Sequence, residues 1–154
     1  MLTHISILLV LAGALVTKIF AVDGQLSIVE GQTLEHYTIG QNTMPLGFAV
    51  TLNRFTVGFY PGGDFPRSFE SQITILEPAT GGNQSRIISM NHPTEYKGYT
   101  FYQSSYSQED GQNTSVLSVS CDPGQPIVFT GYVTMLAGML VILAARAMKR
   151  KNNT

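Results

Sequence analysis

The chain offers few side chains that could carry catalysis or bind a cofactor, because it has three histidines and one cysteine among its 154 residues. His4 stands beside the first long apolar segment of the sequence. An ionisable side chain in or near a bilayer is costly without a partner, so such a residue is a candidate ligand. The alternative for His4 is an interfacial role, with the imidazole hydrogen-bonded to headgroups or water. His4 is therefore the first candidate for binding chemistry.

The remaining candidates are less suited to catalysis. Cys121 is a lone cysteine, which excludes an internal disulfide, a Cys-x-x-Cys redox pair and a cysteine-based zinc site. A catalytic thiol would need a histidine, which His36 or His92 could supply in space. A single cysteine beside a strand end is more often a small buried residue, and His36 lies in a polar stretch where we expect it to be exposed. The sequence also lacks a Gly-rich phosphate loop and the H-E-x-x-H and G-x-S-x-G motifs, which favours a non-catalytic protein.

The densest aromatic segment covers residues 91–106, which hold four of the seven tyrosines. Pro93 cannot donate to a strand ladder and biases His92 toward an extended backbone, so we interpret His92 first as a turn residue. Lys97 and Gly98 predict a turn into the next strand. The tyrosines could form a binding platform, although most strand tyrosines are amphipathic sheet residues with their hydroxyls at the surface.

Two apolar segments, residues 5–22 and residues 127–145, lie near the two ends of the sequence. At about 1.5 Å per residue the first would span about 27 Å, close to the thickness of a bilayer core. A cleaved signal peptide is the alternative for the first segment, but a positive n-region and a clean Ala-x-Ala site are missing. Each segment therefore predicts one membrane-spanning helix. In the second, Thr130, Thr134 and Gly138 predict a small-residue face for contact with another helix.

The distribution of charge predicts the orientation in the membrane. Four of the nine basic residues directly follow the second apolar segment: Arg146, Lys149, Arg150 and Lys151. Because cytoplasmic flanks collect Lys and Arg, we expect the C-terminus in the cytoplasm and, after two crossings, the N-terminus there too. All ten acidic residues lie in residues 23–122, so the outer segment is net acidic and unsuited to bind nucleic acid.

The central segment predicts one β-rich domain, large enough for a modest core. Short, largely alternating runs of β-branched and aromatic residues predict strands at residues 48–52, 55–60, 71–76, 86–90, 99–102 and 115–120. The predicted fold class is a membrane-anchored all-β protein with an antiparallel β-sandwich or barrel-like outer domain between two transmembrane helices. The predicted order is a short cytoplasmic N-terminus (1–4), a transmembrane helix (5–22), an extracytoplasmic β-rich domain (23–126), a second transmembrane helix (127–145) and a basic cytoplasmic tail (146–154).

Several short motifs accompany the tyrosine-rich segment in a fixed order: Glu30-Gly31-Gln32, Phe55 through Tyr60-Pro61-Gly62-Gly63 with Phe65-Pro66, the strand entry at Phe69 and Ser71, and Asp122-Pro123-Gly124. Each is weak evidence alone, but their order between two apolar segments is strong evidence. Together they resemble the ResB family, also called CcsB, the membrane subunit of the system II pathway for cytochrome c maturation. The resemblance covers nearly the whole chain.

The resemblance implies a role in haem handling. ResB-like proteins work with a CcsA-type partner to carry haem across the membrane and present it, reduced, to apocytochrome c. The family is usually longer, and this chain resembles its last part. The resemblance places a membrane histidine implicated in haem ligation at His4, which is compatible with neutral imidazole as an axial ligand. His92 is a weaker candidate. The chain has no tryptophan, so it lacks the tryptophan-rich haem motif of the partner.

The expected function is thus a non-catalytic membrane subunit of cytochrome c maturation, with haem shared with a CcsA-type partner and apocytochrome c as the recipient. We expect it in the inner (cytoplasmic) membrane as a multi-pass protein, with lipid around the helices and the central domain outside the cytoplasm. One alternative is a membrane-anchored β-domain scaffold or sensor without haem chemistry. Another is an outward-facing thiol hydrolase that uses Cys121 and His92.

Overall fold

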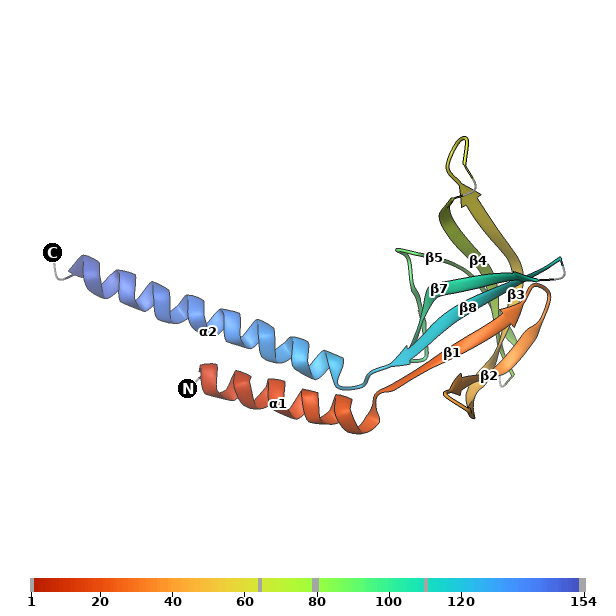
Figure 1. The fold of residues 1–154 in the computed structure, drawn as a ribbon. Helices are drawn as coiled ribbons and strands as arrows, with labels where there is room; N and C mark the ends of the chain where they lie inside the picture. The colour runs from red at the N-terminus through yellow and green to blue at the C-terminus, as the bar shows by residue number, and fades with distance from the viewer. Residues whose placement is uncertain (1, 64, 79–80, 110, 153–154) are drawn as a thin grey trace. The chain divides into compact units, whose positions relative to one another are not determined.

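The structure is a computed structural model, and it describes residues 2–63, 65–78, 81–109 and 111–152. Met1 and residues 153–154, which belong to the predicted terminal segments, lie outside the described residues. The chain divides into two compact units (Figure 1). One unit contains the two terminal helices, and the other is an all-β domain of residues 22–121.

The helical unit consists of α1 (Leu2–Phe20) and α2 (Gln125–Asn152). Each is long and apolar enough to cross a membrane. α1 begins three residues before the predicted segment 5–22, and α2 extends beyond the predicted segment 127–145 at both ends. The earlier start of α2 has a local cause. Pro126 lies in the first turn of α2, where a backbone N–H would have no acceptor within the helix, so proline is tolerated there. The helical hydrogen bonds begin at the Gly124 carbonyl, which accepts from the N–H of Val128 at 3.1 Å.

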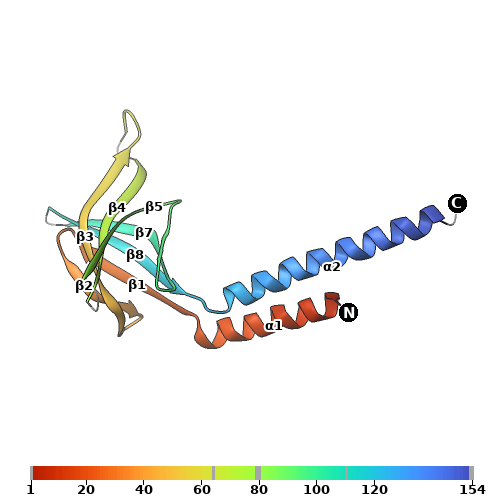
Figure 2. The same cartoon turned by 180° about the vertical axis from the view of Figure 1, so that it is seen from behind.

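The β domain is one antiparallel sheet, and its strand order is β5-β4-β3-β2-β1-β8-β7-β6. Its strands in chain order are β1 (Val22–Val29), β2 (Thr33–Ile39), β3 (Asn42–Phe59), β4 (Pro66–Glu77), β5 (Gly82–Ser89), β6 (Thr94–Tyr96), β7 (Tyr99–Glu109) and β8 (Gln112–Cys121). β1 and β8 pair along their lengths, with Val22 opposite Cys121, and run side by side in both views (Figures 1 and 2). The sheet curls into a nearly closed barrel, which confirms the predicted antiparallel, barrel-like class.

β3 replaces two predicted strands, residues 48–52 and 55–60, with one strand of 18 residues. The prediction of two strands was wrong because the register against β4 shifts between Leu52 and Arg54. Phe48, Val50 and Leu52 alternate into the core, and Phe55 returns to it after the shift. An inserted residue of this kind is a β-bulge, which breaks the two-residue period without ending the strand.

β1 and β2 were missed because few of their residues are apolar and buried. In β1 only Leu26 and Ile28 are buried hydrophobic residues, and in β2 only Tyr37 is. The other positions are polar or partly exposed. The run of alternating apolar and polar residues is therefore too short to predict a strand from sequence. Their pairing with neighbours on both sides places them at the centre of the sheet.

The barrel closes where the two ends of the sheet meet. The backbones of Ser89 and His92 form an isolated antiparallel bridge, with N···O distances of 3.2 and 3.1 Å. The Thr94 hydroxyl donates to the Ile87 carbonyl at 3.4 Å. These contacts join β5 to β6 only near the end of β5, so closure is partial. The core inside contains fully buried large side chains such as Phe48 and Phe101.

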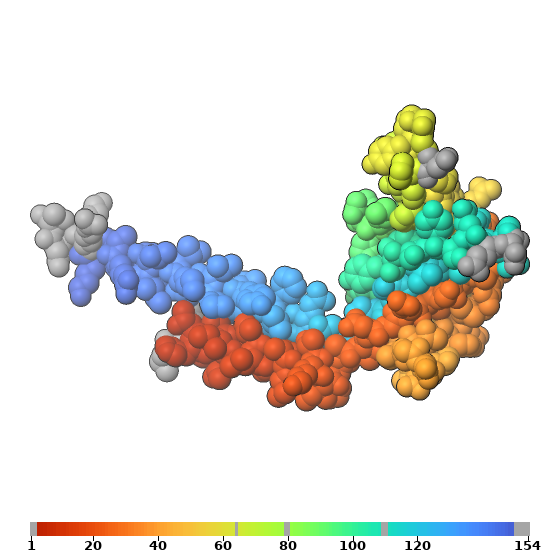
Figure 3. Space-filling model, in the orientation of Figure 1, coloured from red at the N-terminus to blue at the C-terminus, as the bar shows by residue number. Residues whose placement is uncertain are grey.

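The β3–β4 hairpin projects from the barrel, as the space-filling view shows in yellow (Figure 3). At its base, the rings of Phe69 and Tyr106 pack at a tilt of 46° with their centroids 4.8 Å apart, and the ring centroid of Phe55 lies 5.5 Å from that of Tyr106. Near its tip, Tyr60 and Phe65 are exposed. The aromatic residues at the base therefore close one end of the core, while those at the tip face solvent.

Candidate functional site

His4 lies near the N-terminal end of α1 and is exposed. Ser6, two residues later, is fully buried against α2. Because successive helix residues are rotated by about 100°, His4 lies on the opposite side of α1 from Ser6. The imidazole is therefore directed away from α2.

The contact between α1 and α2 rests on small residues spaced by seven. Gly124, Gly131 and Gly138 are buried along α2 and just before it, and Ser6 and Gly13 are buried along α1. A repeat of seven residues keeps one face of a straight helix pair in register, since two turns take about seven residues. The helices are antiparallel, because Gly124 contacts Thr17 while Gly131 contacts Val10.

The approach of the two helices is close enough to require glycine. A Cβ atom on Gly131 would lie 2.6 Å from Val10 Cγ2 and 3.0 Å from the Val10 backbone nitrogen. A Cβ atom on Gly13 would lie 2.6 Å from Val128 Cγ2 and 2.8 Å from the Val128 nitrogen. Without a hydrophobic driving force between helices in lipid, such backbone proximity is what holds a pair together.

The predicted small-residue face at four-residue spacing was wrong for Thr130, which is exposed, whereas Thr134 is half-buried between Gly131 and Gly138. The Thr130 hydroxyl donates to the Pro126 carbonyl at 2.8 Å, and the Thr134 hydroxyl donates to the Thr130 carbonyl at 2.7 Å. Both hydroxyls are thus satisfied within α2. Gly138 is buried as predicted, but it belongs to the seven-residue glycine series. The spacing of Gly124, Gly131 and Gly138 in the sequence was the signal that could have identified this face.

The β domain contains a buried polar cluster made by Ser71, Gln103 and Ser115, from β4, β7 and β8. The Ser71 hydroxyl donates to Gln103 Oε1 at 2.6 Å, and the Gln103 amide donates to Ser115 Oγ at 3.1 Å. No buried side-chain polar atom among the described residues lacks a hydrogen-bond partner. Because the three side chains form hydrogen bonds with one another, we interpret the cluster as a structural element of the β domain.

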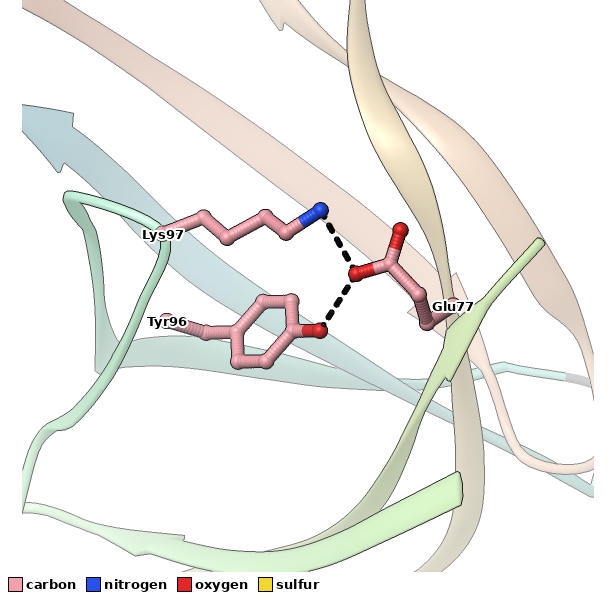
Figure 4. A network of polar contacts seen from close by, with 3 residues as sticks. All are labelled: Glu77, Tyr96 and Lys97. Carbon is pink, nitrogen blue, oxygen red and sulfur yellow. Dashed lines mark hydrogen bonds and ion pairs between the residues drawn. The ribbon is translucent and has the colours of Figure 1, made fainter. Parts of the chain in front are cut away.

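A second polar network holds the β6–β7 hairpin to the end of β4 (Figure 4). Glu77 Oε2 accepts a hydrogen bond from the Tyr96 hydroxyl at 2.8 Å and lies 2.6 Å from Lys97 Nζ. These donors hold the pKa of Glu77 below its usual value, with Lys97 the larger cause, and the same carboxylate raises the pKa of Lys97. Lys97 has a φ of 49° and precedes Gly98 at 80°, which confirms the predicted turn.

The other candidate residues are not brought together. His92 is exposed in the turn after β5, and its Nδ1 lies 3.3 Å from the Ser89 hydroxyl, in agreement with a role in the turn. His36 is exposed on β2. Cys121 is half-buried at the end of β8, with Sγ 4.0 Å from an added Cβ on Gly98. No group of three His, Cys, Asp or Glu side chains placed to hold a metal ion occurs in the part of the chain that the structure describes.

Comparison with known proteins identifies the family of the chain. Residues 1–116 match the ResB-like family. The chain belongs to this family. It is 30% identical over 101 residues to Protein NrfI of Wolinella succinogenes, an alignment that covers 66% of the ResB-like chain and 11% of NrfI. It is 28% identical over 108 residues to the cytochrome c biogenesis protein CcsB of Gloeobacter violaceus, covering 68% and 23% of the two chains.

A plastid protein and a solved structure extend the comparison. The ResB-like chain is 28% identical over 113 residues to the chloroplastic cytochrome c biogenesis protein CCS1 of Chlamydomonas reinhardtii, covering 68% and 18% of the two chains. Its fold matches cytochrome c haem lyase CcmF with a TM-score of 0.51 at 12% identity, over 92% of this chain and 23% of CcmF. The chain thus spans a quarter or less of the length of these proteins.

Proposed function

We propose that this ResB-like chain is a non-catalytic membrane subunit of cytochrome c maturation, which assists haem transfer or presentation to apocytochrome c together with a CcsA-type partner. The relatives named as cytochrome c biogenesis proteins support the pathway. The two helices support a multi-pass protein of the inner membrane. The basic residues after the second helix support an arrangement with the β domain outside the cytoplasm.

The observation that carries the proposal is the position of His4. Its side chain is exposed and lies on the opposite side of α1 from the buried Ser6. A neutral imidazole there can ligate haem iron as cargo from one side. α2 offers no histidine, since the chain's other histidines are His36 and His92. His4 would therefore supply one imidazole ligand to the haem, and a second histidine ligand would come from the partner.

The β domain fits presentation better than haem binding. His92, the weaker candidate, is engaged with Ser89, and the barrel interior is filled by its own core. The same observation favours a second candidate function, a membrane-anchored scaffold or sensor without haem chemistry. The two differ in whether haem depends on His4.

The absorption spectrum of the purified protein separates these functions. The chain is expressed with and without a CcsA-type partner, as wild type, His4→Ala and the matched control His36→Ala, which removes an exposed histidine of the β domain. A Soret band that requires the partner and His4, but not His36, supports the shared haem role. A Soret band that is unchanged in His4→Ala would show that His4 is not a haem ligand. Absence of haem in every preparation would favour the second candidate function, a scaffold or sensor without haem chemistry.

A further inference from the structure

The outer face of the β domain carries a row of polar side chains across three neighbouring strands. Gln25 of β1 stands opposite Ser118 of β8 on one side and opposite Thr38 of β2 on the other. Asp23 of β1 stands opposite Ser120 of β8. Each of these five residues alternates along its strand with a more buried neighbour, so the five side chains share the outer face of the sheet.

A groove of about 570 Å³ follows this polar row. It is lined by the five polar residues and by four others from the same three strands and the turn after β2: Gly24, Ile39, Gly40 and Val119. Sites for small ligands have volumes of about 300–1,000 Å³. The groove is therefore large enough to hold a small polar group such as the headgroup of a lipid.

The side chains of the groove favour a cation that can donate hydrogen bonds. Asp23 is the one charged residue among its described lining residues, and Asp23 Oδ1 accepts from the Ser120 hydroxyl at 2.6 Å. No basic side chain among the described residues forms an ion pair with this carboxylate. The second oxygen of Asp23 and the Ser118 hydroxyl are therefore available as acceptors. A primary ammonium has three N–H donors for such oxygens, whereas a quaternary ammonium has none.

The groove lies at the end of the β domain where the chain enters and leaves it. Asp23 follows Phe20, the end of α1, by three residues, so their Cα atoms are at most about 11 Å apart. Ser120 precedes Gln125, the start of α2, by only five residues. The headgroup layer extends about 5–8 Å beyond the hydrocarbon core of a bilayer. With α1 and α2 in the membrane, both connections therefore keep the groove within reach of lipid headgroups.

An exposed tyrosine continues the same face of the sheet. Tyr102 of β7 stands opposite Ser118 and is 46% exposed. Tyrosine is enriched at membrane–water interfaces, because its ring is apolar and its hydroxyl is polar. A tyrosine beside the groove is thus suited to contact with the lipid whose headgroup the groove holds.

We propose that this groove binds the headgroup of a lipid with a primary amine, such as phosphatidylethanolamine, through Asp23. The ammonium group donates to the second carboxylate oxygen of Asp23 and to the Ser118 hydroxyl. The bound lipid ties the β domain to the membrane surface beside its two chain connections. This inference rests on the proposed function for the membrane placement of the helices, and it involves neither His4 nor haem.

The test uses the full chain in nanodiscs of phosphatidylcholine alone or of phosphatidylcholine and phosphatidylethanolamine in equal parts. Mass spectrometry counts the lipids that the protein retains after gentle extraction into detergent, and hydrogen exchange is followed at the Gly40 amide. From the mixed nanodiscs we expect a preference for phosphatidylethanolamine of roughly two- to fivefold, the effect of one exposed ion pair. The Gly40 amide should also exchange more slowly there. Equal retention of the two lipids would overturn the proposal.

Two variants of the same charge change provide a matched pair. Asp23→Asn removes the charge but keeps an oxygen for the Ser120 hydroxyl, and it should abolish the preference between the lipids. Glu35→Gln removes an exposed carboxylate of β2 outside the groove and should retain the wild-type preference. A wild-type preference in Asp23→Asn would contradict the assignment. If Asp23→Asn does not fold, the exchange of Gly40 in the wild-type chain still decides the question.

The outcomes also separate this inference from the proposed function. A chain that enters nanodiscs but shows no lipid preference overturns the headgroup site alone and leaves the haem role of His4 untouched. A chain that does not enter nanodiscs overturns the membrane placement, and the headgroup site with it.

Discussion

The Thr17 hydroxyl donates a hydrogen bond to Asp122 Oδ1 at 2.8 Å, which joins the last turn of α1 to the segment just before α2. The same carboxylate oxygen accepts the N–H of Gly124 at 2.9 Å. Asp122 therefore organises the start of α2 and fixes it to α1 with one atom. Asp122 and Gly124 of the Asp122-Pro123-Gly124 motif therefore act together at the start of α2.

Replacing Asp122 with Ala should destabilise the helix pair by about 1–2 kcal/mol, because both the turn bond and the link to Thr17 are lost. Thermal unfolding in detergent, followed by helix signal, measures the effect. Thr130→Val is the control, since that hydroxyl bonds only within α2. Equal stability of Asp122→Ala and wild type would show that the link contributes nothing.

Gly131→Ala should separate the helices, because the new Cβ would meet both the side chain and the backbone of Val10. Alanine favours a helix over glycine by up to about 1 kcal/mol, while overpacking costs about 1–3 kcal/mol. We expect net destabilisation. Gly63→Ala is the matched control, since its Cβ would meet only Phe65 at 3.7 Å or more. Stabilisation by Gly131→Ala would mean that the contact is looser than described.

The Glu77–Lys97 network should make the β6–β7 hairpin sensitive to acid. The pKa of Glu77 is lowered by its donors, so its contribution is complete above the usual value of 4.5 and is lost as pH falls through the lower folded pKa. The pKa of Lys97 is raised, so its contribution is present below the usual 10.5 and is lost as pH rises through the higher folded pKa.

The stability of the β6–β7 hairpin should therefore be greatest between these two pKa values. Glu77→Gln should remove the loss of stability at acid pH. Hydrogen exchange of the β6 amides as a function of pH measures this stability. Glu95→Gln removes a different, exposed carboxylate of β6 and should leave the profile as in wild type. An acid side that is identical in wild type and Glu77→Gln would refute the role of the network.

Ser71→Ala should destabilise the β domain by about 1–3 kcal/mol, because the buried oxygen of Gln103 loses the closer of its two hydroxyl donors, Ser71 at 2.6 Å and Ser115 at 3.4 Å. Ser68→Ala, an exposed position on the same strand, should have little effect. Chemical denaturation followed by tyrosine fluorescence compares the two variants. Similar midpoints for both would indicate that water replaces the lost hydroxyl.

The sequence predicted the class of the fold because class depends on patterns that are local. The apolar segments and the alternating runs, such as that of β8, needed no knowledge of tertiary contacts. β3 was divided in two because a bulge at Asn53 breaks alternation without ending a strand. Glu77 bonds to Tyr96 and Lys97, which lie 19 and 20 residues away in the chain. Thr17 bonds to Asp122, which lies 105 residues away. No local sequence pattern indicates pairs that are so far apart.

In the candidate site, too, some features follow from the sequence and others depend on tertiary contacts. His4 was singled out because the ResB resemblance places a membrane histidine there, and an ionisable residue beside an apolar segment is compatible with that role. Its direction relative to α2 required the contact face, which depends on the glycines at seven-residue spacing. β6 could not be predicted from sequence, because its three residues are too few to give a strand pattern.

The pairing of Val22 with Cys121 means that the chain enters and leaves the β domain on adjacent strands. The two attachment points are thus about 5 Å apart, the spacing of neighbouring strands. Neighbouring ends of this kind allow a domain to be inserted within a chain, because the insertion adds almost no distance between the segments that flank it. A short turn is therefore long enough to take the place of residues 22–121, and it would leave the glycines of the helix pair unchanged.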